Sequence, residues 1–149
     1  ADDVNRTVEA TGFDFVQLHG SESPAYCERI EKPVIKALRI FPGTSTAEME
    51  LALAAYADVV DYYLIDTGST GAAGGTGKTF DWGVLEGLIF PKPWFLAGGL
   101  SPANIDEALE RLSPSGVDVA SGVEEKPGQK DFEAIDRFVE AVRGRVANR

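Results

Sequence analysis

Asp66 is the side chain whose type and position best suit acid-base chemistry. It ends a predicted strand at residues 61–66 and precedes a glycine-rich segment, Thr67 to Thr79. Ligand-facing groups of α/β folds lie at the carboxyl ends of strands, so a carboxylate there, beneath a loop that could close over it, is a candidate general acid. A structural aspartate that accepts hydrogen bonds from loop amides fits the position equally well.

His19, a Gly-Gly pair and a Ser-Gly pair follow other predicted strands. His19 comes after residues 13–18, although a lone histidine is more often a structural hydrogen-bond partner. Gly98-Gly99 and Ser121-Gly122 follow residues 94–97 and 116–120, and their unhindered amides could hold a phosphate, as the last two loops of barrels commonly do. Two glycine-bearing turns without a ligand are the alternative.

A third glycine-rich run, Ala72 to Thr79, fits the relaxed Walker A pattern. A true P-loop follows its strand directly and opens a helix at its Lys-Thr pair. Here Thr67 to Gly71 separate the run from its strand, and Phe80-Asp81-Trp82 precede the next helix. We therefore expect an active-site loop. A P-loop NTPase, in which Lys78 would control ATP affinity, is a third hypothesis behind the two given below.

The elements that must position these residues alternate in type. Short apolar runs predict strands, and amphipathic or capped stretches between them predict helices, the first at Val4 to Thr11. Ser101-Pro102 resembles a helix cap followed by proline at the first helical position. The predicted strands are 13–18, 33–40, 61–66, 94–97 and 116–120, and the other predicted helices are 21–30, 46–57, 81–88, one after 101–102, and 132–142. Such a βαβ series implies an α/β fold with parallel strands.

Polar residues recur on one face of these strands. Gln17 and His19 share a face, and Lys36, Asp66 and Asp118 occupy one face of other strands, with apolar residues between them. This pattern suits a barrel interior near its mouth better than a sheet covered on both faces. A complete (β/α)8 barrel, however, rarely has fewer than about 200 residues, whereas this chain has 149.

Composition limits the partners. A net charge of -10 argues against nucleic acid or an anionic membrane, and no apolar run approaches the roughly 20 residues of a membrane helix. The single cysteine, Cys27, excludes an internal disulfide and lies on a predicted helix, so we assign it no catalytic role. We expect a cytoplasmic protein.

Five segments together closely resemble phosphoribosylanthranilate isomerases, and their order and spacing match as well. They are residues 16–20 (VQLHG), 64–67 (LIDT), 75–82 (GTGKTFDW), 97–100 (AGGL) and 117–124 (VDVASGVE). The resemblance covers nearly the whole chain. It implies a (β/α)8 TIM barrel that converts N-(5'-phosphoribosyl)anthranilate to its 1-deoxyribulose isomer by an Amadori rearrangement in tryptophan biosynthesis, without metal or organic cofactor.

The resemblance also implies a role for each candidate residue. Asp66 matches the general acid that protonates the ribose ring oxygen. His19 matches a histidine at the anthranilate end of the pocket, and Asp118 matches a carboxylate near the ribose hydroxyls. The backbone cradle for the substrate phosphate is matched by Gly98, Gly99, Ser121 and Gly122. The segment that imitates Walker A matches a loop that partly covers the site.

The sequence departs from the family pattern in places that bear on activity. Ala120 stands where many members have serine, and the strand ending in Cys-Gly-Ile, which carries the general base, is not found, nor is the strand exit with an arginine for the anthranilate carboxylate. We therefore expect one partial domain over residues 1–149, units four to eight of an incomplete barrel with the preceding helix. Weak or no activity of the isolated chain is expected. The alternative is a non-catalytic phosphate-binding half that pairs with an amino-terminal partner chain or with itself.

Overall fold

A parallel sheet of five strands, in the order β1-β2-β3-β4-β5, forms the centre of this computed structural model, which describes residues 1–67 and 82–146. The strands are β1 (Val16–Leu18), β2 (Val34–Arg39), β3 (Tyr62–Asp66), β4 (Trp94–Ala97) and β5 (Gly116–Val117). Each pairs with the next along the chain, so all the carboxyl ends lie at one edge. The predicted α/β class with parallel strands is confirmed.

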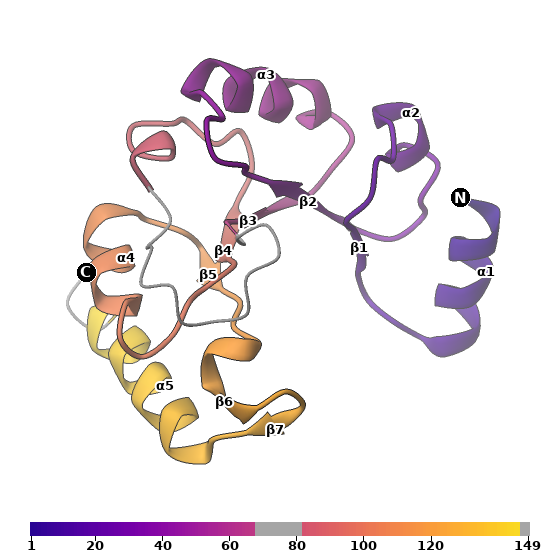
Figure 1. Cartoon of the computed structure of the whole chain (residues 1–149). Coiled ribbons are helices and arrows are strands. Elements are labelled where there is room, and N and C mark those ends of the chain that lie inside the picture. Colours follow the sequence, from indigo (N-terminus) through magenta and orange to yellow (C-terminus); the bar gives the residue numbers. More distant parts are fainter. Residues whose placement is uncertain (68–81, 147–149) are drawn as a thin grey trace.

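The helices lie along the outer side of the curved sheet (Figure 1). They are α1 (Asp2–Thr11), α2 (Pro24–Cys27), α3 (Thr46–Tyr56), α4 (Ile105–Arg111) and α5 (Phe132–Val146), with short 3-10 helices η1 (Trp82–Val84) and η2 (Ser121–Val123). A hairpin of β6 (Glu124–Lys126) and β7 (Gln129–Lys130) precedes α5. A capping box between Ser45 and Glu48 explains the start of α3, and left-handed Gly12 ends α1.

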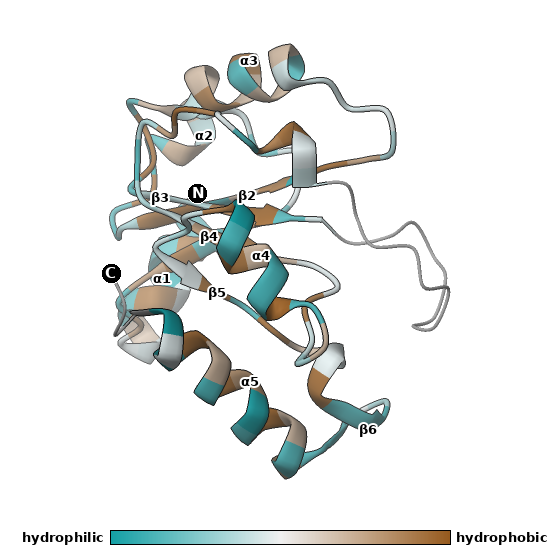
Figure 2. Ribbon diagram, turned by 90° about the vertical axis from the view of Figure 1, so that its left-hand side faces the viewer, coloured by the Kyte–Doolittle hydropathy of each residue, from teal (hydrophilic) through white to brown (hydrophobic). Residues whose placement is uncertain are grey.

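The core lies between the sheet and these helices. Tyr63, Ile65 and Leu96 are fully buried on the outer face of the sheet. The hydroxyl of Tyr63 donates to the carbonyl of Leu53 on α3 at 2.6 Å. In Figure 2 the strands are largely brown, whereas α4 and α5 carry teal and brown bands, as amphipathic helices that cover a core do. Burial of this apolar surface therefore sets the order of the layers.

The inner face of the sheet carries a row of aromatic rings. The ring of Tyr62 lies 5.8 Å from that of Phe15 and 5.7 Å from that of Phe95, which it stacks on. Next in the row is Gly116, where an added Cβ would come within 2.7 Å of the Phe95 ring. Phe15 is half exposed. The inner face is thus apolar at its middle and leaves its polar residues to the carboxyl edge.

Lys36 was expected on the inner face with the other polar residues, and this expectation is wrong. Its register partners are Leu18 on β1 and Tyr63 on β3, which belong to the outer face. The side chain is only 1% exposed. A lysine buried under helices must be paired, because an isolated charge in an apolar environment is costly.

Several predicted boundaries also shift. The first and last strands are shorter than predicted, and the predicted helix 81–88 contains only η1 among its described residues. The predicted cap at Ser101-Pro102 is wrong, because α4 begins at Ile105. A turn precedes the helix, closed by the Ser101 amide, which donates to the Asn104 side chain at 2.8 Å.

None of the helices in the described ranges combines the length and the apolar character that crossing a membrane would require.

Candidate active site

Asp66 ends β3 at the carboxyl edge of the sheet, beside Arg39 on β2 and Ala97 on β4. The Arg39 side chain donates from Nε to Oδ2 of Asp66 at 3.3 Å. The Asp66 side chain is 28% exposed, so a ligand can reach it. Arg39 was not singled out from the sequence, although the alternation Ile35, Ala37, Arg39 places it on the inner face with Asp66.

Thr67 joins the acid to the first glycine pair. Its hydroxyl lies 2.7 Å from the carbonyl oxygen of Gly98 and 3.0 Å from that of Ala97, and its amide donates to Ala97 at 3.0 Å. The side chain is 3% exposed. Because Thr67 directly follows Asp66, these bonds fix the acid relative to the β4 exit loop. This role of Thr67 was not predicted, since a threonine after a strand carries no distinctive sequence signal.

The two glycine loops pack against each other. Gly98 and Gly99 have φ angles of 85° and 67°, which favour glycine. At Gly122 an added Cβ would lie 1.7 Å from the carbonyl oxygen of Leu100, so only glycine lets the β5 loop approach the β4 loop this closely. Ser121, exposed, begins η2 in the same loop. The two loops that carry the predicted phosphate-binding amides therefore lie next to each other.

Lys130 of the β6–β7 hairpin holds the loop that follows β5. Its ammonium donates to the carbonyl of Ala120 and to the Glu124 carboxylate, each at 2.8 Å. The loop backbone just before Ser121 is therefore tied to β6 and β7. The chain after Ala120 thus forms η2 and then this hairpin before α5 begins.

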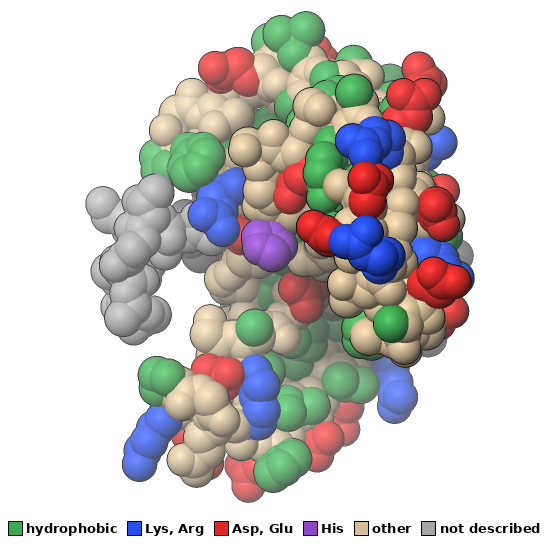
Figure 3. Space-filling model, turned by 90° about the vertical axis from the view of Figure 1, so that its right-hand side faces the viewer, with side chains coloured by type: hydrophobic (Ala, Val, Ile, Leu, Met, Phe, Trp, Pro, Cys, Tyr) green, Lys and Arg blue, Asp and Glu red, His purple; other side chains and the backbone are tan. Residues whose placement is uncertain are grey.

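Asp118 and His19 stand at the two ends of the candidate site. The Asp118 amide donates to Leu96 at 2.8 Å, which places the exposed Asp118 side chain beyond β5, next to β4. His19 follows β1 and is exposed (Figure 3). The strand order therefore gathers Asp66, the glycine loops and Asp118 on adjacent strands, whereas β2 separates His19 from Asp66. The Walker-like segment 72–79 lies outside the described residues.

An ion pair beneath the exit of β1 joins Lys36 to Glu22 at 2.7 Å. Burial alone would raise the pKa of Glu22, but the hydrogen bond and charge of Lys36, together with backbone amides, hold that pKa below its usual value of 4.5. A carboxyl group whose pKa is lower in the folded state stabilises the fold above its unfolded pKa, and this stabilisation is lost as pH falls through the folded pKa.

We therefore expect a pH-dependent effect of Glu22→Gln. The loss in free energy of unfolding relative to the parent should be greatest near pH 7 and should shrink as pH falls below 4.5, since acid neutralises the parent carboxylate. Urea unfolding of both proteins at several pH values between 7 and 3 measures this difference. A difference that stays constant over the whole range would contradict the assignment.

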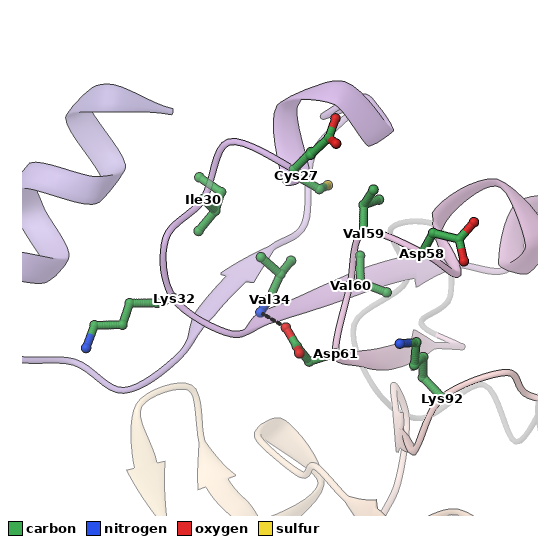
Figure 4. A pocket seen from close by; sticks show the side chains of 10 residues that line it. Cys27, Ile30, Lys32, Val34, Asp58, Val59, Val60, Asp61 and Lys92 are labelled. Carbon is green, nitrogen blue, oxygen red and sulfur yellow. Dashed lines mark hydrogen bonds between the residues drawn. The ribbon is translucent and has the colours of Figure 1, made fainter.

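Cys27 and the pocket beside it lie away from this site. The thiol is 1% exposed, and burial raises its pKa, so it is not a ready nucleophile. The pocket, about 290 Å³, lies at the amino-terminal ends of β2 and β3 (Figure 4). There Asp61 already accepts the Val34 amide at 2.8 Å. Ligands of α/β barrels bind at the opposite, carboxyl edge, where the candidate residues are.

Comparison with known proteins agrees with this geometry. The profile of the N-(5'phosphoribosyl)anthranilate (PRA) isomerase family matches residues 1–141. An N-(5'-phosphoribosyl)anthranilate isomerase from Microcystis aeruginosa is 44% identical over 142 residues, which cover 92% of this chain and 65% of that protein. The chain thus spans slightly less than two thirds of this relative's length.

Solved structures support the same assignment. The phosphoribosyl anthranilate isomerase from Thermotoga maritima superposes with a TM-score of 0.79 at 34% identity, covering 96% of this chain and 68% of that one. A phosphoribosyl anthranilate isomerase in complex with reduced 1-(o-carboxyphenylamino)-1-deoxyribulose 5-phosphate gives a TM-score of 0.72 at 30% identity, over 96% and 66%. The sheet is therefore an open part of a TIM-barrel arrangement, and the chain belongs to the N-(5'-phosphoribosyl)anthranilate isomerase family.

Proposed function

We propose that this chain supplies the general acid and the phosphate cradle of an N-(5'-phosphoribosyl)anthranilate isomerase. The reaction is the Amadori rearrangement of that substrate to 1-(2-carboxyphenylamino)-1-deoxyribulose 5-phosphate. The observation that carries the proposal is the tie from Asp66 through Thr67 to Gly98, which couples an accessible carboxyl group to the β4 exit loop. A solved relative in complex with a reduced form of this product supports the choice of ligand.

In the proposed mechanism Asp66 donates a proton to the ribose ring oxygen as the bond from that oxygen to C1 breaks. The nitrogen lone pair then forms the C1–N double bond of an open-chain Schiff base. Without the proton the leaving oxygen would be an unstable alkoxide. Arg39, in contact with one carboxylate oxygen, orients the acid. Removal of the C2 proton then gives an enolamine, which tautomerises to the ketone product.

The amides of Gly98, Gly99, Ser121 and Gly122 are proposed to bind the phosphate. Backbone amides suit this task because they are fixed hydrogen-bond donors that can point at the phosphate oxygens. Asp118 is proposed to contact the ribose hydroxyls, and His19 the anthranilate ring. Binding of the phosphate at one end of the substrate would hold the ribose ring oxygen in a fixed position beside Asp66.

The proton at C2 needs a base that Cys27 cannot supply, because its thiol is buried on the outer side of the sheet. We propose that the base comes from a segment carrying the family's Cys-Gly-Ile strand, either in the same protein or as a separate partner. The aromatic row of the inner face, in which Phe15 is half exposed and Tyr62 and Phe95 are partly buried, offers the surface for such a segment.

A complementation assay tests this function. The chain is assayed alone and fused behind the first three βα units of the Thermotoga maritima isomerase, with substrate consumption followed by fluorescence. Loss of a general base lowers the rate about 100- to 10,000-fold. The chain alone should therefore show at most about one hundredth of the activity of the fusion. Family-like turnover by the chain alone would refute the need for a second segment. A folded fusion that neither turns over substrate nor binds the reduced product would refute the function.

A further inference from the structure

Lys36 is a buried charged side chain that the proposed mechanism does not use. Its ammonium has three protons to donate, and three acceptors lie around it. They are the carbonyl oxygen of Gly20 at 2.8 Å, Oε2 of Glu22 at 2.7 Å and the carbonyl oxygen of Leu18 at 3.5 Å. All three belong to the segment that leaves β1, so this one side chain gathers the backbone on both sides of His19.

Glu22 closes the same segment from the other direction. Both of its carboxylate oxygens accept the amide of Gly20, at 3.0 and 3.1 Å, while one of them also accepts Lys36. Tyr56 of α3 completes the enclosure, since its hydroxyl donates to the Glu22 carbonyl at 2.8 Å and its ring lies 5.6 Å from the Lys36 ammonium. Residues 18–22 are thus held by charged groups that are themselves fixed by packing.

His19 lies within residues 18–22, but its own side chain does not help to fix this segment. The imidazole is exposed, and within residues 1–67 and 82–146 it makes no hydrogen bond or ion pair. Its place at the mouth of the sheet is therefore set through its backbone neighbours, Leu18 and Gly20. Charged hydrogen bonds are stronger than neutral ones, so the ion pair is well suited to this task.

We propose that Lys36 and Glu22 are positioning residues that fix the exit loop of β1 and thereby determine where the His19 imidazole stands. The proposal deepens the proposed function, because it makes this outer-face ion pair a determinant of how the anthranilate end of the substrate is bound. Neither residue touches substrate. The ion pair acts through the Leu18 and Gly20 backbone.

The test uses His19 as its own reporter, since it is the chain's only histidine and its Cε1–H group gives one signal in a proton–carbon NMR spectrum. The double variant Lys36→Met with Glu22→Gln removes both charges and leaves no buried charge unpaired. Glu22→Gln alone is the second variant. The matched control is Glu107→Gln, which removes a carboxylate that pairs with Arg111 along exposed α4.

In the folded double variant we expect the His19 signal to broaden or divide and the Gly20 amide to exchange at least ten times faster. We expect affinity for reduced 1-(o-carboxyphenylamino)-1-deoxyribulose 5-phosphate to fall at least tenfold, with affinity for inorganic phosphate unchanged. If the ion pair only stabilised the fold, the affinities for both ligands would fall together. Glu107→Gln should match the parent in every readout.

Unchanged His19 and Gly20 signals in a folded double variant would overturn the proposal, as would parallel loss of both ligands. If the double variant does not fold, the same criteria apply to Glu22→Gln. If the parent chain and its fusion fail to bind the reduced product, the proposed function fails, and the His19 and Gly20 signals still decide whether the ion pair positions the loop.

Discussion

Asp66→Asn, introduced into the fusion described above, is expected to lower kcat by about 100- to 10,000-fold. Asparagine keeps the size of the side chain, and its amide oxygen can still accept the hydrogen bond from Arg39. It has, however, no carboxyl proton to donate. In the proposed mechanism the substrate is bound mainly through its phosphate and anthranilate groups, so KM should change little. Steady-state kinetics under conditions where chemistry limits the rate separate the two parameters.

The control for this variant is Asp136→Asn, the same change on exposed α5. It should leave kcat, KM and stability close to those of the parent. An Asp66→Asn enzyme that retains its kcat would show that Asp66 is the structural aspartate considered at the outset. An unfolded Asp66→Asn protein, recognised by its circular dichroism, would assign it a structural role as well.

Gly122→Ala is expected to have the second large effect, on phosphate binding and on stability together. The new Cβ would lie 1.7 Å from the Leu100 carbonyl oxygen, so the β4 and β5 loops must move apart. Overpacking of this kind costs about 1–3 kcal/mol. Affinity for inorganic phosphate should fall about 10- to 100-fold, the equivalent of one hydrogen bond to a charged group. Calorimetry and urea unfolding measure the two effects.

Gly144→Ala is the matched control, because nothing lies within 4 Å of a Cβ added there in α5. Alanine is a better helix former than glycine, so this variant should be more stable by about 0.5–1 kcal/mol and bind phosphate as the parent does. Equal phosphate affinity in Gly122→Ala and Gly144→Ala would mean that the close contact of the two loops does not shape the phosphate site.

Strands were predicted best where a short apolar run is bounded by residues that break regular structure. Residues 94–97 form β4 as predicted, because Trp94-Phe95-Leu96-Ala97 lies between breaking residues and is buried by its neighbours. The position of Asp66 at a strand end is confirmed for the same reason. The parallel direction of the strands followed from the alternation of strands and helices.

The orientation of Lys36 could not be predicted this way. It is flanked by Ile35 and Ala37, so both faces of the strand look apolar in the sequence. Its side was decided by Glu22, which lies 14 residues earlier and meets it only in the folded sheet. The start of α4 failed for a related reason, since Ser101 and Asn104 close a turn that competes with a helix cap.

The site was predictable in its strand-end residues and not in the bonds that support them. Asp66, His19 and the glycine pairs stand at strand exits, as periodicity indicates. Thr67, Arg39 and Lys130 escaped notice because their roles depend on partners that are distant in sequence, such as Gly98 for Thr67.

The Thr67 hydroxyl, which lies between the carbonyl oxygens of Ala97 at the end of β4 and Gly98 just after it, bears on how this fold could be re-engineered. Because of this contact, β3 and β4 should be exchanged together when the protein is recombined with a relative. Asp66 and the β4 exit loop then keep their relative positions. A chimera with its crossover between these strands would inherit both groups but not their alignment. Recombination sites in this fold are therefore better placed outside the β3–β4 pair, so that Thr67 and its two acceptors come from the same parent.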